Sequence, residues 1–315
     1  MAGSTRACAQ RRNWSLEMPA DATANSAAPP PVAAWRRVRR ALAGCPLFVG
    51  ICIAWLVGTV AVALTVELIS PYHYAQIDLR ARLQPPVFLG GEWRHFLGTD
   101  ELGRDVASRL FYSIRMSLLV ALLGTAIGAA IGTLLGFVAA HFRGWVDDLI
   151  MTFVDFQASM PFMIIALSVL AFFGNSLPLF IALMGLFGWE RYTRLVRGMT
   201  LSAKEHGYAI AIRQLGASPW RVYGRHILPN IASVLIVNIT LNLPEHIILE
   251  TGLSFLGLGV QPPLTSLGNM VGHGREYLQS AWWIAVFPGL AIVFTTLSMS
   301  IVGDWARDRL DPTLR

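Results

Sequence analysis

Long apolar runs dominate the chain and alternate with short polar segments. Six runs stand out, at about 46–68, 116–140, 149–173, 177–189, 231–250 and 282–303. Most approach the length of about 20 apolar residues with which a helix crosses a bilayer. Only Gly174-Asn175-Ser176 separates the third run from the short fourth one, so a tight hairpin within the membrane is expected there. The pattern predicts an all-α integral membrane protein with six transmembrane helices.

Composition supports this interpretation and narrows the function classes. The chain is 54% hydrophobic and only 14% charged, whereas soluble domains carry about 25% charged residues. Its net charge of +6 fits the Arg and Lys that cytoplasmic loops retain. No basic run alternates with stacking aromatic residues, so nucleic acid is not expected as a partner. Cys8, Cys45 and Cys52 have neither metal-ligand spacing nor the pattern of a disulfide framework, and no metal site is predicted.

The first 45 residues differ from the rest of the chain. Residues 1–45 are rich in Ala, Pro, Ser and Arg without apolar periodicity, which predicts a disordered basic tail. Met18 is an alternative start to Met1. The run 46–68 is interpreted as a retained signal anchor, because its apolar length is that of a membrane span rather than of a cleaved signal peptide.

The distribution of basic residues predicts the orientation in the membrane. The tail before the first run holds seven Arg, the segment 190–230 holds seven Arg or Lys, and the segment 251–281 holds only Arg275. Because cytoplasmic loops retain Arg and Lys, the N-terminal tail, 190–230 and the C-terminal tail 304–315 are expected in the cytoplasm. The segment 69–115, ending in an interfacial amphipathic helix, and the segment 251–281 are expected on the periplasmic side. Residues 116–303 form the predicted core domain.

The segment 207–230, GYAIAIRQLGASPWRVYGRHILPN, has an internal design. Ala211, Ile212 and Leu215 share one helical face, and Gly216 follows where a helix end favours glycine. Ser218-Pro219 is an N-cap followed by proline at the first helical position, and Pro229 is expected to stop the second short helix. The pattern predicts a helix–glycine–helix elbow, with a solvated connector as the alternative. The elbow residues are Tyr208, Ala211, Ile212, Leu215, Gly216, Ala217, Ser218, Pro219, Leu228 and Pro229.

This elbow resembles the cytoplasmic coupling motif of bacterial ABC-importer permeases, an EAA triplet followed by glycine and by I-x-L-P. The triplet corresponds to Ile210-Ala211-Ile212, the glycine to Gly216 and the last two residues to Leu228-Pro229. Ile210 replaces the acid, so an ion pair from that acid to an ATPase is absent. Two further stretches, LGTDELGRDVASRLFYSIRMSL and ETGLSFLGLGVQPPLTSLGNMV, resemble the C-type permease subunit of oligopeptide, dipeptide and nickel importers. The resemblance covers about residues 45–315.

The resemblance implies a type I ABC importer permease of the inner membrane with both termini in the cytoplasm. It implies three kinds of protein partner: a second homologous permease, two cytoplasmic ABC ATPase subunits that bind ATP and Mg, and a periplasmic solute-binding protein. The implied role of the elbow is to dock the ATPases. Peptide is the expected cargo, with nickel, glutathione or another small solute as alternatives.

The polar stretch before the second run allows two interpretations. Gly98 and Gly103 permit tight turns, while Asp100, Arg104 and Asp105 can satisfy one another and cap a helix that begins near Val106. The stretch is either an entry cap for that helix or a contact for the binding protein. Its candidate residues are Gly98, Thr99, Asp100, Gly103, Arg104 and Asp105.

Acidic residues in or near the runs are candidates for a pathway, because ionisable groups within a membrane usually have a function. They are Asp155, Glu245 and Glu250, and interhelical polar contacts are the alternative. The resemblance implies that the Gly- and Pro-rich segment 251–281 is an outer lid. Glycines at 124, 128, 132 and 136 allow a close helix contact, either within the chain or with a second permease.

No catalytic motif is present in the sequence. The chain has no G-x-x-x-x-G-K-[ST] phosphate loop, no H-E-x-x-H and no G-x-S-x-G, so ATP and Mg are expected on partner ATPases and no catalytic residue is predicted. A self-sufficient secondary transporter is an alternative, although it predicts inverted repeats that the sequence does not display. An intramembrane hydrolase using Ser254 or His246 is another, but no pattern places a nucleophile beside a base.

Overall fold

The computed structural model describes residues 46–205, 218 and 221–310. The chain separates into two units, residues 1–45 and residues 46–315. The predicted tail is the first unit and lies outside the described residues. In the second unit the described residues form helices and short helical turns, without a strand. The predicted all-α class is confirmed for this part of the chain.

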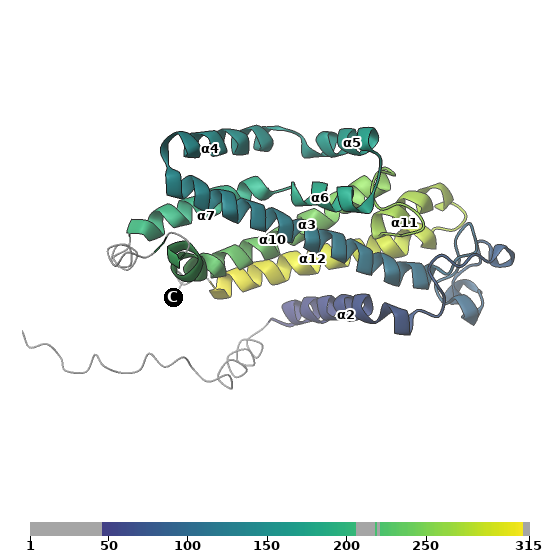
Figure 1. Ribbon diagram of the computed structural model, residues 1–315. Helices are drawn as coiled ribbons and strands as arrows, with labels where there is room; N and C mark the ends of the chain where they lie inside the picture. Colours follow the sequence, from purple (N-terminus) through teal and green to yellow (C-terminus); the bar gives the residue numbers. More distant parts are fainter. Residues whose placement is uncertain (1–45, 206–217, 219–220, 311–315) are drawn as a thin grey trace, which may run out of the picture. The chain divides into compact units, whose positions relative to one another are not determined.

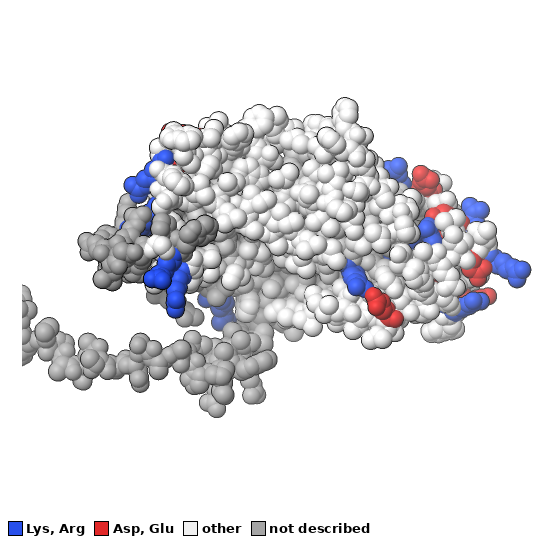
Figure 2. Space-filling model, in the orientation of Figure 1, with Lys and Arg blue, Asp and Glu red and all other residues white. Residues whose placement is uncertain are grey.

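Four helices are long and apolar enough to cross a membrane, which supports a multi-pass membrane protein. Each contacts at least two of the others, and Figure 1 shows them side by side. Figure 2 shows charged side chains gathered mainly at the two ends of the helices, with a mostly uncharged band between them. The four are α2 (Leu47–Ile69), α3 (Val106–Phe142), α10 (Leu228–Phe255) and α12 (Trp283–Leu310).

Two of these helices extend beyond the runs that predict them. α3 begins at Val106, so the interfacial helix expected before residue 116 is the outer end of α3 rather than a separate element. α12 continues to Leu310, through most of the expected tail 304–315. Amphipathic or charged ends can extend an apolar span as one helix, because backbone hydrogen bonds do not depend on side-chain polarity.

The predicted third and fourth spans are not single membrane helices. The run 149–173 is broken into α4 (Gly144–Ser159) and α5 (Phe162–Phe173), which meet at 87°. The break falls at Met160-Pro161, where proline removes a backbone donor and restricts the residue before it. α6 (Leu177–Gly185) has 9 residues, about 14 Å of helix, against about 30 Å of hydrocarbon. The described chain thus has four candidate spans, or five if the bent pair counts as one, and six is not confirmed.

Part of the basic segment 190–230 is a packed helix and not a loop. α7 (Trp189–Glu205) lies along α3 in extensive contact. Three of the arginines counted as loop charges, Arg191, Arg194 and Arg197, are on this helix. The sequence does not reveal their position because their acidic partners are far away in the chain.

The close packing of α3 against α6 and α7 depends on the glycines at positions 124, 128, 132 and 136 of α3, called here the glycine ladder. A Cβ at Gly132 would lie 2.5 Å from the carbonyl oxygen of Trp189 and 2.6 Å from the Cβ of Tyr192. At Gly124 it would lie 2.7 Å from the Cβ of Met184. Such distances are shorter than any contact between real Cβ atoms and neighbouring heavy atoms. The ladder is therefore a contact within this chain.

Pro229 does not stop a helix, contrary to the prediction. A π-helical turn, η4 (Val222–Ile227), continues directly into α10. The N–H of Leu228 bonds to the carbonyl of Tyr223, five residues earlier. This wider turn accommodates a proline, which has no N–H to donate and whose ring clashes with the carbonyl four residues before it in a regular helix.

The segment 251–281 is partly helical and tightly packed. After α10 it forms α11 (Leu267–Gly274) and the 3-10 turn η5 (Arg275–Tyr277). A Cβ at Gly268 would lie 2.4 Å from the carbonyl oxygen of Thr251. The hydroxyls of Ser113 and Thr265 are 3.0 Å apart, which ties this segment to α3. These contacts fix part of the segment against the helices, whereas its irregular stretches at 256–257, 262–263 and 278–280 are exposed.

The glycine ladder yields a prediction with an internal control. Gly132→Ala should lower the thermal unfolding midpoint of the purified protein, because overpacking against backbone atoms costs about 1–3 kcal/mol. Gly198→Ala is the control on α7, since nothing lies within 4 Å of the added Cβ. It should be neutral or raise the midpoint slightly, as Ala favours helix over Gly by about 1 kcal/mol. Equal effects of the two changes would show that the ladder does not hold these helices together.

Candidate functional site

The predicted elbow is described only at its ends. Ser218 is exposed, and its carbonyl accepts hydrogen bonds from the N–H groups of Arg221 at 3.0 Å and Val222 at 3.1 Å. An N-cap carbonyl accepts bonds of this kind, and the first helical residue described after Ser218 is Arg221. Leu228 and Pro229 are in the first turn of α10. The other elbow residues lie outside the described residues: Tyr208, Ala211, Ile212, Leu215, Gly216, Ala217 and Pro219.

Both flanks of the elbow are fixed at the C-terminal end of α3. Tyr223 packs in a buried cluster with Ala203 of α7, and its hydroxyl is 2.8 Å from Nδ1 of His141. The ammonium group of Lys204 donates a hydrogen bond to the carbonyl of Ala140. A force applied to the elbow would thus reach α3, α7 and α10 through packed side chains.

The polar stretch predicted before the second apolar run, residues 98–105, is called here the outer polar stretch. It is built around the carboxylate of Asp100, which is fully buried. Its Oδ2 accepts a hydrogen bond from Nε of Arg104 at 2.7 Å and another from the guanidinium of Arg109. Its Oδ1 accepts from the backbone N–H groups of Leu102 and Arg104, both at 2.9 Å. The predicted pairing of Asp100 with Arg104 is confirmed, whereas the role of Arg109 was not predicted. A buried acid is stable only with such compensation.

Tight turns and Thr99 attach this stretch to its surroundings. Gly98 and Gly103 have φ of +79° and +72°, as their predicted turn role requires. A Cβ at Gly103 would lie 1.7 Å from the carbonyl oxygen of Asp78. The carbonyl of Thr99 accepts a hydrogen bond from the indole N–H of Trp283 at 3.1 Å, which joins the outer segment to α12.

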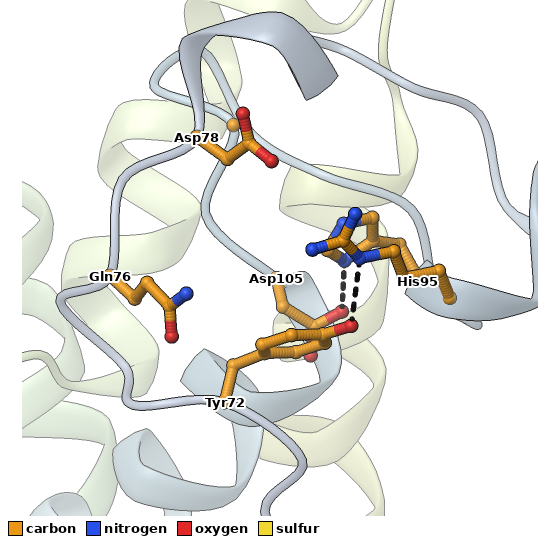
Figure 3. Close-up of a pocket in the computed structure, with 7 residues that line it drawn as sticks. Tyr72, Gln76, Asp78, His95 and Asp105 are labelled. Atoms are coloured by element: carbon orange, nitrogen blue, oxygen red, sulfur yellow. Dashed lines mark hydrogen bonds and ion pairs between the residues drawn. The ribbon is translucent and has the colours of Figure 1, made fainter.

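Asp105 caps α3 as predicted and also binds a histidine. Its Oδ2 accepts from the N–H of Ser108 at 2.8 Å, and its Oδ1 is 3.1 Å from Nδ1 of His95. Figure 3 shows this pair in a small pocket with Tyr72. The Tyr72 hydroxyl accepts a hydrogen bond from Nε of Arg94 at 3.2 Å, and this bond raises the pKa of the Arg94 guanidinium.

The outer polar stretch has the chemistry of a structural cap. Its buried charges are paired with one another, and no group of three or more His, Cys, Asp or Glu in the described chain could hold a metal ion. The surrounding turns are η1 (Leu79–Ala81), η2 (Val87–Leu89) and η3 (Trp93–His95). This arrangement fixes the N-terminal end of α3 to the segment between α2 and α3 and to α12.

The three acids predicted for a pathway lie in two environments. The side chains of Asp155 on α4 and Glu245 on α10 are 71% and 46% exposed. They pair with Arg194 at 2.8 Å and Arg191 at 2.5 Å, two arginines on α7 that the prediction did not assign to them. Glu250 is fully buried and accepts a hydrogen bond from Ser254 at 2.7 Å. The structure thus groups Asp155 with Glu245 and separates Glu250.

Ser254 and His246 do not form a nucleophile–base pair with each other. The hydroxyl of Ser254 donates to Glu250, and Nδ1 of His246 lies 3.1 Å from the carbonyl oxygen of Asn242. A nucleophile and its base would have to be within hydrogen-bond reach of each other. The two residues instead have separate partners, so neither activates the other.

Comparison with known proteins gives consistent matches. Residues 132–315 match the family model described as binding-protein-dependent transport system inner membrane component. The chain is 38% identical over 264 residues to the dipeptide transport system permease protein DppC of Escherichia coli K12, covering 84% of this chain and 88% of the relative. It is 35% identical over 247 residues to the oligopeptide transport system permease protein OppC of Mycobacterium tuberculosis H37Rv, covering 78% and 83%. It is also 35% identical over 256 residues to the glutathione transport system permease protein GsiD of Pectobacterium atrosepticum, covering 81% and 84%.

The cluster around Asp100 predicts that removing its carboxylate lowers the free energy of unfolding much more than removing an exposed carboxylate does. Asp100→Ala should lower the free energy of unfolding by about 3–5 kcal/mol, because it leaves a buried guanidinium without a counter-ion. Glu67→Ala removes the partner of Arg115 from a pair whose side chains are 44% and 72% exposed, so about 0–1 kcal/mol is expected. Denaturant unfolding in detergent measures both. A loss for Asp100→Ala no greater than for Glu67→Ala would contradict the structural role of the cluster.

Proposed function

Because the chain belongs to the family of binding-protein-dependent transport system inner membrane components, we propose that it forms a peptide translocation pathway with a second homologous permease. The observation that carries this proposal is the likeness over more than three quarters of the chain to oligopeptide, dipeptide and glutathione transport permeases. The chain is a peptide-type permease of an ABC importer. Nickel or another small solute is the alternative cargo, and glutathione is itself a short peptide.

ATP hydrolysis on separate subunits drives the pathway in this proposal. The chain lacks a phosphate loop, so two cytoplasmic ABC ATPases bind ATP and Mg, and this chain has no catalytic role. The elbow docks one of them. The small residues of the elbow sequence permit close approach, and the side chains that fix its flanks to α3 and α10 support transmission of movement. With Ile210 in place of the acid, the contact is apolar.

The proposed topology has six crossings of the inner membrane with both termini in the cytoplasm. The bent pair α4–α5 is the third crossing, and α6 followed by α7 is the fourth. Two observations support this division: α6 and α7 follow the α3 glycine ladder in succession, and α7 ends beside the inner end of α3. The outer segment between α2 and α3 then faces the periplasm. A solute-binding protein docks there, on a surface that the Asp100 cluster keeps rigid.

The elbow supplies the test of this function. Gly216→Val or Ala211→Glu should abolish uptake and co-purification of the ATPases while leaving membrane insertion intact, because a bulky or charged side chain prevents close docking. Arg221→Glu and Arg225→Glu are the controls. Both side chains are exposed, and exposed charges contribute little to packing, so their effects should be smaller.

Pull-down of tagged chain from membranes and peptide uptake by whole cells are the two measurements. Full uptake and normal ATPase recovery with both Gly216→Val and Ala211→Glu would exclude the elbow as the docking site.

A further inference from the structure

Two exposed ion pairs lie at a depth where the membrane interior is expected. One joins Nη1 of Arg191 to Glu245 and also to the side-chain oxygen of Asn242 at 3.2 Å. The other joins Arg194 to Asp155. Arg191 and Arg194 are three residues apart on α7 and therefore lie on the same helical face. The two pairs form one polar stripe across the exposed sides of α4, α7 and α10, called here the exposed ion pairs.

The depth of this stripe follows from the glycine ladder. The stretch 116–140 of α3 carries no charged residue. Trp189 and Tyr192, which flank Arg191 in α7, contact α3 at Gly132. Gly132 lies eight residues from the inner end of that stretch, which corresponds to about 12 Å of helix. His246, the neighbour of Glu245, is beside Gly124 in the middle of the stretch.

Charged side chains at this depth cannot face lipid tails. They are found against protein or beside a water-filled cavity. A dry protein contact would have to remove water from four charges, which is costly even for paired ions. Another ion pair, between Asp147 of α4 and Arg197 of α7, is much less exposed to water and serves for comparison. Asp147 is 8% exposed and is held by two bonds from Arg197, at 2.5 and 2.6 Å.

The exposed ion pairs differ from the Asp147–Arg197 pair in their exposure to water and in their bond geometry, and both properties affect how easily another charged group replaces a partner. The four side chains of the exposed ion pairs are 46–71% exposed. Neither pair is bidentate, because each arginine makes a single hydrogen bond to its carboxylate. Exposed pairs of this kind contribute little to stability, so a competing charge displaces a partner easily. Each pair presents one positive and one negative group to the same space.

We propose that the exposed ion pairs are a binding site within the pathway for the charged ends of a free peptide. The arginines receive the terminal carboxylate, and Asp155 or Glu245 receives the terminal ammonium. This proposal rests on the peptide-transport function and adds to it the chemical class of ligand that the permease itself contacts.

The test uses the assembled transporter in nanodiscs, with Cys8, Cys45 and Cys52 of this chain replaced by alanine. Reporter cysteines are introduced singly at Thr152 on α4 and Ile248 on α10. Both are exposed, and each is three residues from an acid of the exposed ion pairs. A small hydrophilic thiol reagent then measures access of water. Leu64→Cys on α2, 80% exposed and apolar, is the lipid-facing control.

The expected result has three parts. Both reporters react much faster than Leu64→Cys. Alanyl-alanine at millimolar concentration slows their modification several-fold, whereas N-acetyl-alanyl-alanine amide, which has no charged ends, does not. The protection weakens in the double variant Arg191→Gln/Glu245→Gln, which removes one of the two pairs, and is unchanged in the matched control Arg115→Gln/Glu67→Gln, which neutralises the exposed pair between α3 and α2.

Two results would overturn the proposal. Reporters that react no faster than Leu64→Cys would mean that the stripe is covered by protein or lipid, the second permease included. Reporters that react but are protected equally by both peptides, or by neither, would mean that the pairs do not bind peptide termini. ATP-driven uptake of alanyl-alanine by the unmodified transporter is measured in parallel. Uptake without protection removes only this site, whereas a lack of uptake removes the peptide-transport function as well.

Discussion

The close approach of α3 to α7 is the constraint on which the rest of the molecule depends. A helix that carries Arg191, Arg194 and Arg197 can lie beside an apolar stretch only if its polar side chains find partners on its other faces. Because the α3 glycines have no side chains, the backbones of α3 and α7 can approach closely. The arginines of α7 then point toward acids on α4 and α10. Because α7 ends at Glu205, this packing also determines where the chain enters the predicted elbow. α3 is fixed at its N-terminal end by the Asp100 cluster and at its C-terminal end by the contact of His141 with Tyr223.

This arrangement gives a physical basis for coupling an ATPase to a pathway. Movement of the elbow would act on α7 directly and, through the ion pairs, on α4 and α10. The inner pair of Asp147 and Arg197 is bidentate and largely buried, so it holds α4 to α7 firmly. The pairs farther from the elbow are exposed and weak. A firm attachment near the elbow and exchangeable charges deeper in the membrane suit a protein that moves as a unit while a charged solute passes.

The sequence predicts those features that depend on local pattern. Apolar length identifies the four long helices, and the Asp105 cap with its neighbouring glycines is readable because capping involves residues three positions apart. Features that depend on distant partners could not be predicted in this way. Arg191 and Arg194 resemble loop charges until Glu245 and Asp155 are placed beside them. Pro229 resembles a helix stop because a π-helical turn leaves no clear signal in composition. The buried Arg109 is likewise indistinguishable from an interfacial arginine without its partner, Asp100.

The central claim is that this chain transports peptides only as one permease of an ATP-driven assembly. Its most direct test is uptake of labelled alanyl-alanine into proteoliposomes that contain this chain, the second permease, the ATPases and the binding protein. Omission of each component in turn completes the experiment. The expected result is ATP-dependent accumulation that requires every component. Accumulation driven by an ion gradient, with this chain alone and without ATP, would contradict the account and identify a secondary transporter.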